Sequence, residues 1–192
     1  MSSGNLKIDP SWTLFLDRDG VINKRIIDGY VRSWEQFEFM PGVQEALKIL
    51  SNSFSKIIVV SNQQGIGKGI MTERDVDAIH EMMIKTIKDN GGRIDRVYFS
   101  PSLKEEYSLY RKPNIGMALS ARKDFPGINF KKSVMVGDSE SDMIFGRKLK
   151  MRTVLISTDK SEIRNIAELI DFVYPDLISF ALDLNKELGI RN

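Results

Sequence analysis

Short apolar runs alternate along this chain with longer stretches whose apolar residues recur at helical spacing. The runs are too short for helices, and their uniform hydrophobicity is typical of strands buried on both faces, as in a parallel sheet. The alternation of the two patterns predicts an α/β fold with a doubly wound parallel sheet. The expected strands are 13–16, 56–60, 97–99, 133–136, 152–156 and 172–173, and the expected helices are 43–52, 73–90, 115–125, one that ends near 149, and two that begin at 161 and 177.

The composition is that of an ordinary globular protein, and no repeat or low-complexity tract interrupts the pattern, so we expect residues 1–192 to form a single domain. The net charge of +2, without any basic run, argues against a nucleic-acid partner. The chain has no cysteine, which excludes disulfides and thiolate metal sites and fits a reducing compartment. No apolar stretch approaches the length needed to span a membrane. We therefore expect a cytoplasmic monomer that does not bind a membrane.

Two carboxylates follow the first apolar run, because Asp17 and Asp19 come directly before Gly20. Alternate residues of an extended chain share a face, so both acids can converge at the carboxyl end of the strand, where open α/β sheets bind ligands. A calcium loop is excluded, since the glycine comes too early and position 28 is aspartate rather than glutamate. On this stretch alone, a solvated turn or an acidic helix cap stays open.

Matching polar residues follow the other expected strands. Ser61 and Asn62 directly follow the second strand, Lys112 lies in the loop after the third, and Asp138 and Asp142 follow the fourth. Taken singly, each has an ordinary explanation as a helix cap or a solvated side chain. Their occurrence together, at the same end of successive strands, predicts one shared pocket.

The chemistry that suits such a pocket is phosphoryl transfer. Clustered carboxylates repel one another by about 4 kcal/mol for each pair at about 4 Å, at an effective dielectric constant near 20. A hard divalent cation relieves this repulsion, and Mg²⁺ suits a site with few carboxylates and a phosphate to share. With the phosphate charge neutralised, one carboxylate can attack phosphorus, and a second can protonate the leaving oxygen and later activate water.

This arrangement resembles the haloacid dehalogenase-like (HAD-like) superfamily. Asp17-x-Asp19-Gly20 looks like its first motif, Ser61-Asn62 its second, Lys112 its third and Gly137-Asp138-x-x-x-Asp142 its fourth. The resemblance implies a three-layer, Rossmann-type fold and a phosphatase, since dehalogenases of the superfamily lack the second acid.

The same resemblance implies a role for each motif residue. Asp17 would be the nucleophile and Asp19 the general acid and base, while Lys112 would pair with Asp17 and the phosphate. Ser61 and Asn62 would hold the transferring phosphoryl group. The Mg²⁺ ligands would be Asp17, the backbone carbonyl of Asp19 and Asp138, with Asp142 placed behind these ligands.

Further stretches resemble the subgroup that contains heptose bisphosphate and histidinol-phosphate phosphatases. They are Leu16 to Gly20, Ser61 to Gly65, and Arg111-Lys112-Pro113. Within the subgroup, Asp28 to Val31 and Gly65 to Gly69 look like the heptose branch. This implies removal of the 7-phosphate of a heptose 1,7-bisphosphate, in the biosynthesis of nucleotide-activated heptose.

The resemblance also leaves no room for a large cap domain, so loops must close the site. We expect Arg111 and Lys68 to bind the second phosphate, and Asn62 and Gln63 to bind sugar hydroxyls. A histidinol-phosphate phosphatase and a binding module without turnover remain the alternatives.

One departure from the subgroup concerns its zinc loop of three cysteines and a histidine. The corresponding positions carry Ser100, Ser102, Ser108 and Tyr110, so we expect no structural zinc. We expect packing of Tyr107 and Tyr110 to hold this loop instead. His80, the only histidine, is interpreted as structural or solvated.

Overall fold

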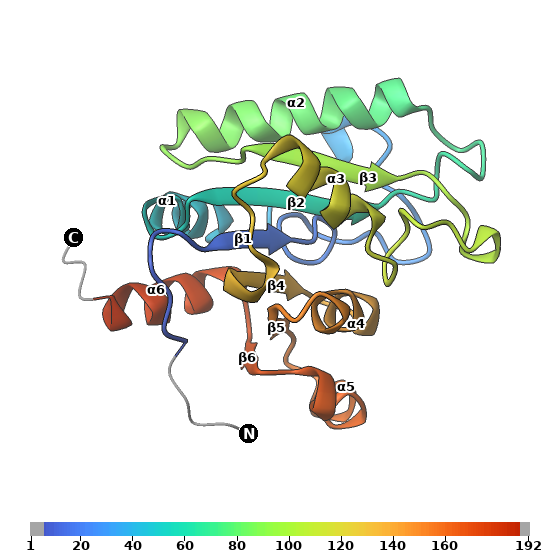
Figure 1. Ribbon diagram of the computed structural model, residues 1–192. Helices are drawn as coiled ribbons and strands as arrows, with labels where there is room; N and C mark the ends of the chain where they lie inside the picture. The colour runs from blue at the N-terminus through green and yellow to red at the C-terminus, as the bar shows by residue number, and fades with distance from the viewer. Residues whose placement is uncertain (1–5, 189–192) are drawn as a thin grey trace.

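The computed structural model describes residues 6–188, which form a six-stranded parallel sheet in the order β3-β2-β1-β4-β5-β6 (Figure 1). This confirms the doubly wound parallel sheet expected from the sequence. The strands are β1 (Thr13–Leu16), β2 (Lys56–Asn62), β3 (Arg96–Ser100), β4 (Ser133–Gly137), β5 (Arg152–Ile156) and β6 (Phe172–Tyr174).

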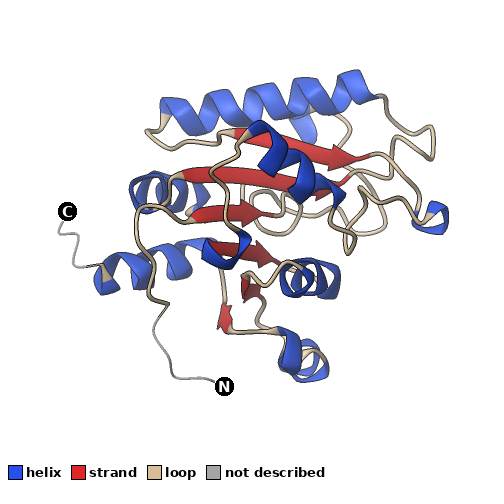
Figure 2. Cartoon of the chain, in the orientation of Figure 1, coloured by secondary structure: helices blue, strands red, loops and turns tan. Residues whose placement is uncertain are grey.

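Helices cover both faces of the sheet and complete three layers (Figure 2). The α-helices are α1 (Val43–Ser53), α2 (Glu73–Asp89), α3 (Gly116–Asp124), α4 (Glu140–Lys148), α5 (Lys160–Asn165) and α6 (Leu177–Glu187). Four short 3₁₀ helices, η1 (Trp34–Gln36), η2 (Lys104–Glu106), η3 (Phe130–Lys132) and η4 (Ala167–Leu169), lie in the connections. Among helices of the described part of the chain, none has both the length and the apolar character needed to cross a bilayer.

Alternate side chains of β1 contribute to two hydrophobic cores, one on each face of the sheet. Leu14 and Leu16 face one side, where they join the cluster formed with α1, α2 and α6. Phe15 faces the other side and packs with side chains of α3 and α4, such as Met117 and Phe145. Because all of β1 is buried on both faces, this strand lies at the centre of the sheet and fixes where the chain emerges at residue 17.

The carboxyl ends of β1, β2 and β3 point to one edge, where the long loops of the molecule gather (right-hand side of Figure 1). Strand β2 runs two residues beyond the expected end and includes Ser61 and Asn62, because these residues pair with Phe99 and Ser100 of β3. Both side chains are therefore held by the sheet rather than by a loop.

Candidate active site

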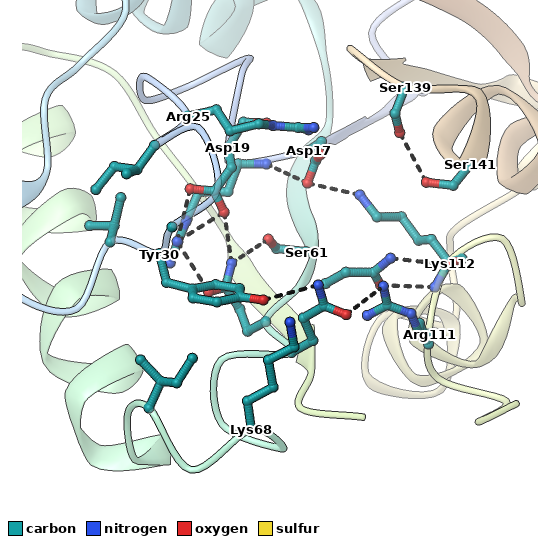
Figure 3. A pocket seen from close by; sticks show the side chains of 18 of the residues that line it. Asp17, Asp19, Arg25, Tyr30, Ser61, Lys68, Arg111, Lys112, Ser139 and Ser141 are labelled. Atoms are coloured by element: carbon teal, nitrogen blue, oxygen red, sulfur yellow. Dashed lines mark hydrogen bonds and ion pairs between the residues drawn. The ribbon is translucent and has the colours of Figure 1, made fainter. Parts of the chain in front are cut away.

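A cavity of about 610 Å³ opens at this edge of the sheet (Figure 3). Its floor is made by the residues that follow β1 and β2, and its walls by the loops around residues 25–31, 63–70 and 111–112. The lining residues are Asp17, Arg18, Asp19, Arg25, Ile26, Asp28, Gly29, Tyr30, Val31, Ser61, Asn62, Gln63, Gln64, Lys68, Ile70, Arg111, Lys112, Ser139 and Ser141.

Asp17 and Lys112 form a buried ion pair on the floor of the cavity. Lys112 Nζ lies 2.8 Å from Asp17 Oδ1 and 2.6 Å from Asp142 Oδ1. Burial opposes the charge on Lys112, but the two carboxylates outweigh it and raise its pKa above the usual value. Burial raises the pKa of Asp17 to about 6 against the opposing effect of Lys112, and Asp142 adds to the rise. Asp17 is only 6% exposed, which rules out the solvated turn.

Asp142 serves the fold and the site at once. Its Oδ2 accepts hydrogen bonds from the backbone N–H of Ser139 at 3.1 Å and from the Ser139 hydroxyl at 2.6 Å, which caps α4. Its other oxygen faces Lys112. The capping and functional interpretations of the fourth motif are therefore compatible, because each uses a different oxygen.

Asp138 completes a cluster of three carboxylates with Asp17 and Asp142, in which one oxygen from each lies within 4.8 Å of the others. Burial, and then repulsion from Asp17, raises the pKa of Asp138 to about 8. Besides Lys112, a second cation already reaches this cluster. The Arg25 guanidinium lies 2.8 Å from Asp138 Oδ1 and donates to the backbone carbonyl of Asp19 at 3.2 Å.

Gly20 permits the close approach of the β1 and β4 ends. Its φ is +96°, and a Cβ at this position would lie 1.8 Å from Asp138 Oδ2. Any larger residue would displace that carboxylate, so the glycine of the first motif is required both for its conformation and for space.

The Asp19 carboxylate is held by three donors. It accepts hydrogen bonds from Arg18 NH2 at 2.9 and 3.0 Å, from Asn23 Nδ2 at 2.9 Å and from Gln63 Nε2 at 2.8 Å. Burial disfavours the charged form, but Arg18 and these hydrogen bonds outweigh it and hold the pKa of Asp19 below its usual value. Asp17 and Asp19 both line the cavity, as expected, but they contact different cations.

The polar residues that end β2 orient their neighbours. Asn62 binds the backbone of Lys112 in both directions, through Oδ1 at 2.9 Å and Nδ2 at 3.1 Å. Gln63 Nε2 also donates to the Ser61 hydroxyl at 2.8 Å. The side chains of Asn62 and Gln63 are thus engaged within the protein, whereas Ser61 accepts one bond and keeps its own hydrogen for a ligand.

The outer wall of the cavity carries the other two cations that the sequence singled out. Lys68 Nζ lies over the Tyr30 ring, 5.5 Å from its centre. The Tyr30 hydroxyl accepts a hydrogen bond from Gln64, and Gln64 Oε1 accepts one from Arg111 NH2 at 3.2 Å. Figure 3 shows Tyr30, Lys68 and Arg111 on one side of the cavity, across from Ser139 and Ser141.

The expectation that Tyr107 and Tyr110 pack to hold the loop after β3 is wrong. Their side chains are 87% and 51% exposed. Hydrogen bonds hold this loop instead, because Arg111 NH1 donates to the Ser102 carbonyl at 3.1 Å and Asn114 Nδ2 donates to the Ser108 carbonyl at 3.0 Å.

Several site residues have no counterpart among the sequence predictions, namely Arg18, Arg25, Tyr30 and Gln64. His80, interpreted as structural or solvated, is 5% exposed and contacts Arg18, so only the structural alternative survives. For Arg18, the signal available in the sequence was its position between two acids, Asp17 and Asp19. No sequence pattern points to Arg25, which lies in an irregular loop.

Comparisons with known proteins identify the family. The family model described as HAD-hydrolase-like matches residues 109–180. A D-glycero-alpha-D-manno-heptose-1,7-bisphosphate 7-phosphatase of Mycobacterium bovis is 42% identical over 132 residues, which cover 69% of this chain and 70% of the relative. A D-glycero-beta-D-manno-heptose-1,7-bisphosphate 7-phosphatase of Helicobacter pylori is 36% identical over 169 residues, which cover 83% of this chain and 95% of the relative.

A solved structure of the D,D-heptose 1,7-bisphosphate phosphatase from B. bronchiseptica, complexed with magnesium and phosphate, is also similar. It matches with a TM-score of 0.80 at 25% identity and covers 92% of this chain and 99% of that one. This chain belongs to the heptose-1,7-bisphosphate 7-phosphatase family of the HAD-like hydrolases.

Proposed function

We propose that this protein is a Mg²⁺-dependent phosphatase that hydrolyses the 7-phosphate of a D-glycero-D-manno-heptose 1,7-bisphosphate. The observation that carries the proposal is the buried Asp17–Lys112 pair on the floor of a polar cavity, beside the carboxylate of Asp138. The names shared by the sequence relatives and the solved structure support the substrate. No observation favours histidinol phosphate or a protein without turnover.

Asp17 is the proposed nucleophile. Its Oδ1 accepts from Lys112 Nζ at 2.8 Å and from the backbone N–H of Arg18 at 2.7 Å. Because both donors bind the same oxygen, Oδ2 is left to attack phosphorus. In the first step an Oδ2–P bond forms and the bond between phosphorus and the sugar O7 breaks, which gives an aspartyl-phosphate.

Asp19 is the proposed general acid and base. Because its pKa is low in the free site, Asp19 takes up a proton as the phosphate dianion binds, and this proton passes to the departing sugar oxygen in the first step. In the second step the Asp19 carboxylate takes a proton from water, whose oxygen attacks phosphorus, and the bond between phosphorus and Asp17 breaks. Phosphate is released and both side chains return to their starting states. Lys112 and the Ser61 hydroxyl donate to the phosphoryl oxygens throughout.

The residues present fit a magnesium ion. Carboxylate oxygens of Asp17 and Asp138 are close enough to share one cation, and the Asp19 carbonyl faces the same place, since Arg25 contacts both it and Asp138. We propose these three groups as the Mg²⁺ ligands. Asp142 is not among them, because one of its carboxylate oxygens pairs with Lys112 and the other caps α4. When bound there, the ion neutralises charge on the phosphoryl group.

The two cations of the outer wall suit a second phosphate. Lys68 and Arg111 lie away from the carboxylate cluster, around Tyr30 and Gln64, where a bisphosphate could place its other end. The cavity volume of about 610 Å³ suits a ligand of this size. We also propose a cytoplasmic monomer, and the cysteine-free sequence supports a reducing compartment.

Phosphate release from a panel of substrates tests the function. We expect kcat/KM for a heptose 1,7-bisphosphate, assayed as both anomers, to exceed that for histidinol phosphate by about 10²-fold or more. The reason is that two charge-assisted contacts are each worth about 1.5–3 kcal/mol. Equal efficiency, or a preference for histidinol phosphate, would contradict the substrate assignment and leave the phosphatase mechanism intact.

A variant sharpens this test. Lys68→Met should lower kcat/KM for the bisphosphate but change little for heptose 7-phosphate, which lacks the second phosphate. Lys85→Met, on the exposed face of α2, is a matched control because it also removes one positive charge.

Arg25 occupies the place where the proposed ligands meet, so it should compete with Mg²⁺. We expect Arg25→Gln to tighten Mg²⁺ binding by about tenfold, the scale expected for removing one partly screened charge at contact distance. Isothermal titration with MgCl₂ alone measures this without turnover. Arg32→Gln changes the same charge outside the cavity lining and should leave the affinity unchanged. Weaker binding in Arg25→Gln would contradict the competition.

A further inference from the structure

His80 lies on the inner face of α2 and is buried against the site from behind. Its Nε2 is 3.1 Å from Arg18 NH1, and its ring centre is 5.6 Å from that of Phe99. Burial, together with the charge of Arg18, lowers the pKa of His80 to about 3, so the imidazole is neutral near pH 7. A neutral Nε2 facing a guanidinium accepts the hydrogen bond, and the ring proton is therefore on Nδ1.

Arg18 connects His80 to the proposed general acid. Its side chain is 1% exposed, and NH2 contacts both oxygens of Asp19 and also Gln63 Oε1 at 3.1 Å. Nε has no partner within the described structure, so NH1 and NH2 alone fix the plane of the guanidinium. An arginine on a flexible stem holds a carboxylate in one direction only when its other nitrogens are anchored.

We propose that His80 is a positioning residue for the general acid and base. By accepting from Arg18 NH1, it holds the guanidinium so that NH2 orients the Asp19 carboxylate toward the floor of the cavity. The inference rests on the proposed function of Asp19. It assigns a purpose to the single histidine of the chain, which lies 62 residues from Arg18 in sequence.

Loss of the acceptor should act on proton transfer rather than on binding. Without His80 Nε2, a buried N–H of Arg18 loses its partner, and the guanidinium turns toward another acceptor, which releases one side of Asp19. A misplaced acid slows the departure of a sugar alkoxide, which needs a proton. It does not slow the departure of p-nitrophenolate, which leaves without one.

The experiment compares His80→Met, which keeps much of the side-chain volume, with His80→Gln, whose amide oxygen reaches toward the position of Nε2. We expect His80→Met to lower kcat on a heptose 1,7-bisphosphate by about 10- to 100-fold with KM unchanged, the effect of misplacing a catalytic group slightly. Single-turnover release of p-nitrophenol from p-nitrophenyl phosphate should stay close to that of the unmodified enzyme. His80→Gln should restore most of the lost kcat.

Asp19→Asn and the double variant separate the possible outcomes. Asp19→Asn should show the same selective loss, larger in size, and adding His80→Met to it should cost little more, because both changes remove one function. If His80→Met slows both substrates equally, or if the two losses multiply, the positioning role is wrong while the function of Asp19 stands. If Asp19→Asn slows both substrates equally, the proposed acid itself is wrong. Should His80→Met fail to fold, as judged by circular dichroism, His80→Asn gives the same comparison, since its amide is too short to reach Arg18.

Discussion

Asp17→Asn is expected to abolish turnover, with kcat reduced by more than about 10⁴-fold, the scale on which removal of a catalytic nucleophile acts. The amide is nearly isosteric with the carboxylate but is a poor nucleophile and cannot form a stable phosphorylated intermediate. The structure supports a chemical rather than a structural loss, because Lys112 keeps a second partner in Asp142. Phosphate release from the heptose bisphosphate measures the effect.

Two controls test whether the loss of turnover is chemical rather than structural. The melting temperature of Asp17→Asn should stay near that of the unmodified enzyme, since the buried Lys112 remains paired. Asp89→Asn, at the exposed end of α2, also removes one carboxylate and should retain full activity. Turnover by Asp17→Asn at a rate near normal would mean that another residue receives the phosphoryl group.

Removal of divalent cations is the second change with a large expected effect. After exhaustive chelation we expect no measurable turnover, because the clustered carboxylates repel one another and also repel the phosphate dianion. Added MgCl₂ should restore activity. CaCl₂ should restore it poorly, since the higher and looser coordination of Ca²⁺ allows Asp17 to bind through both oxygens and so hides the nucleophile.

The measurement is steady-state phosphate release across a titration with each metal salt. A chelated sample checked for metal by elemental analysis gives the baseline, and the same analysis tests the expectation of no zinc at Ser100, Ser102, Ser108 and Tyr110. Full activity in a sample shown to be free of divalent cations would contradict the magnesium proposal.

The sequence was sufficient to predict the fold and the floor of the site. Each strand is a short apolar run, and the order of elements agrees with the structure to within a few residues at each boundary. Asp17, Lys112 and Asp142 meet because parallel strands end at one edge, so position after a strand predicts position in space. Their separate roles stay proposals.

The residues that orient the site from outside the cavity, such as His80, could not be predicted, because they depend on contacts between elements that are distant in the sequence. His80 reaches Arg18 only because α2 joins the larger core with this face inward, where the His80 ring meets Phe99 of β3. Hydrophobic periodicity marks the face but does not specify which side chain it meets. The prediction for the loop after β3 was wrong for a related reason. Arg111 and Asn114 donate to backbone carbonyls, and every residue has a carbonyl, so the sequence does not indicate which one is used.

Trapping the phosphorylated enzyme tests whether Asp17 is the nucleophile. Enzyme turning over a heptose 1,7-bisphosphate is quenched and treated with borohydride, which reduces an aspartyl-phosphate to homoserine, and its peptides are analysed by mass spectrometry. We expect homoserine at position 17 and at no other aspartate, with none in Asp17→Asn. Homoserine at a different position, or no reduced residue in a sample that is releasing phosphate at its full rate, would contradict this assignment.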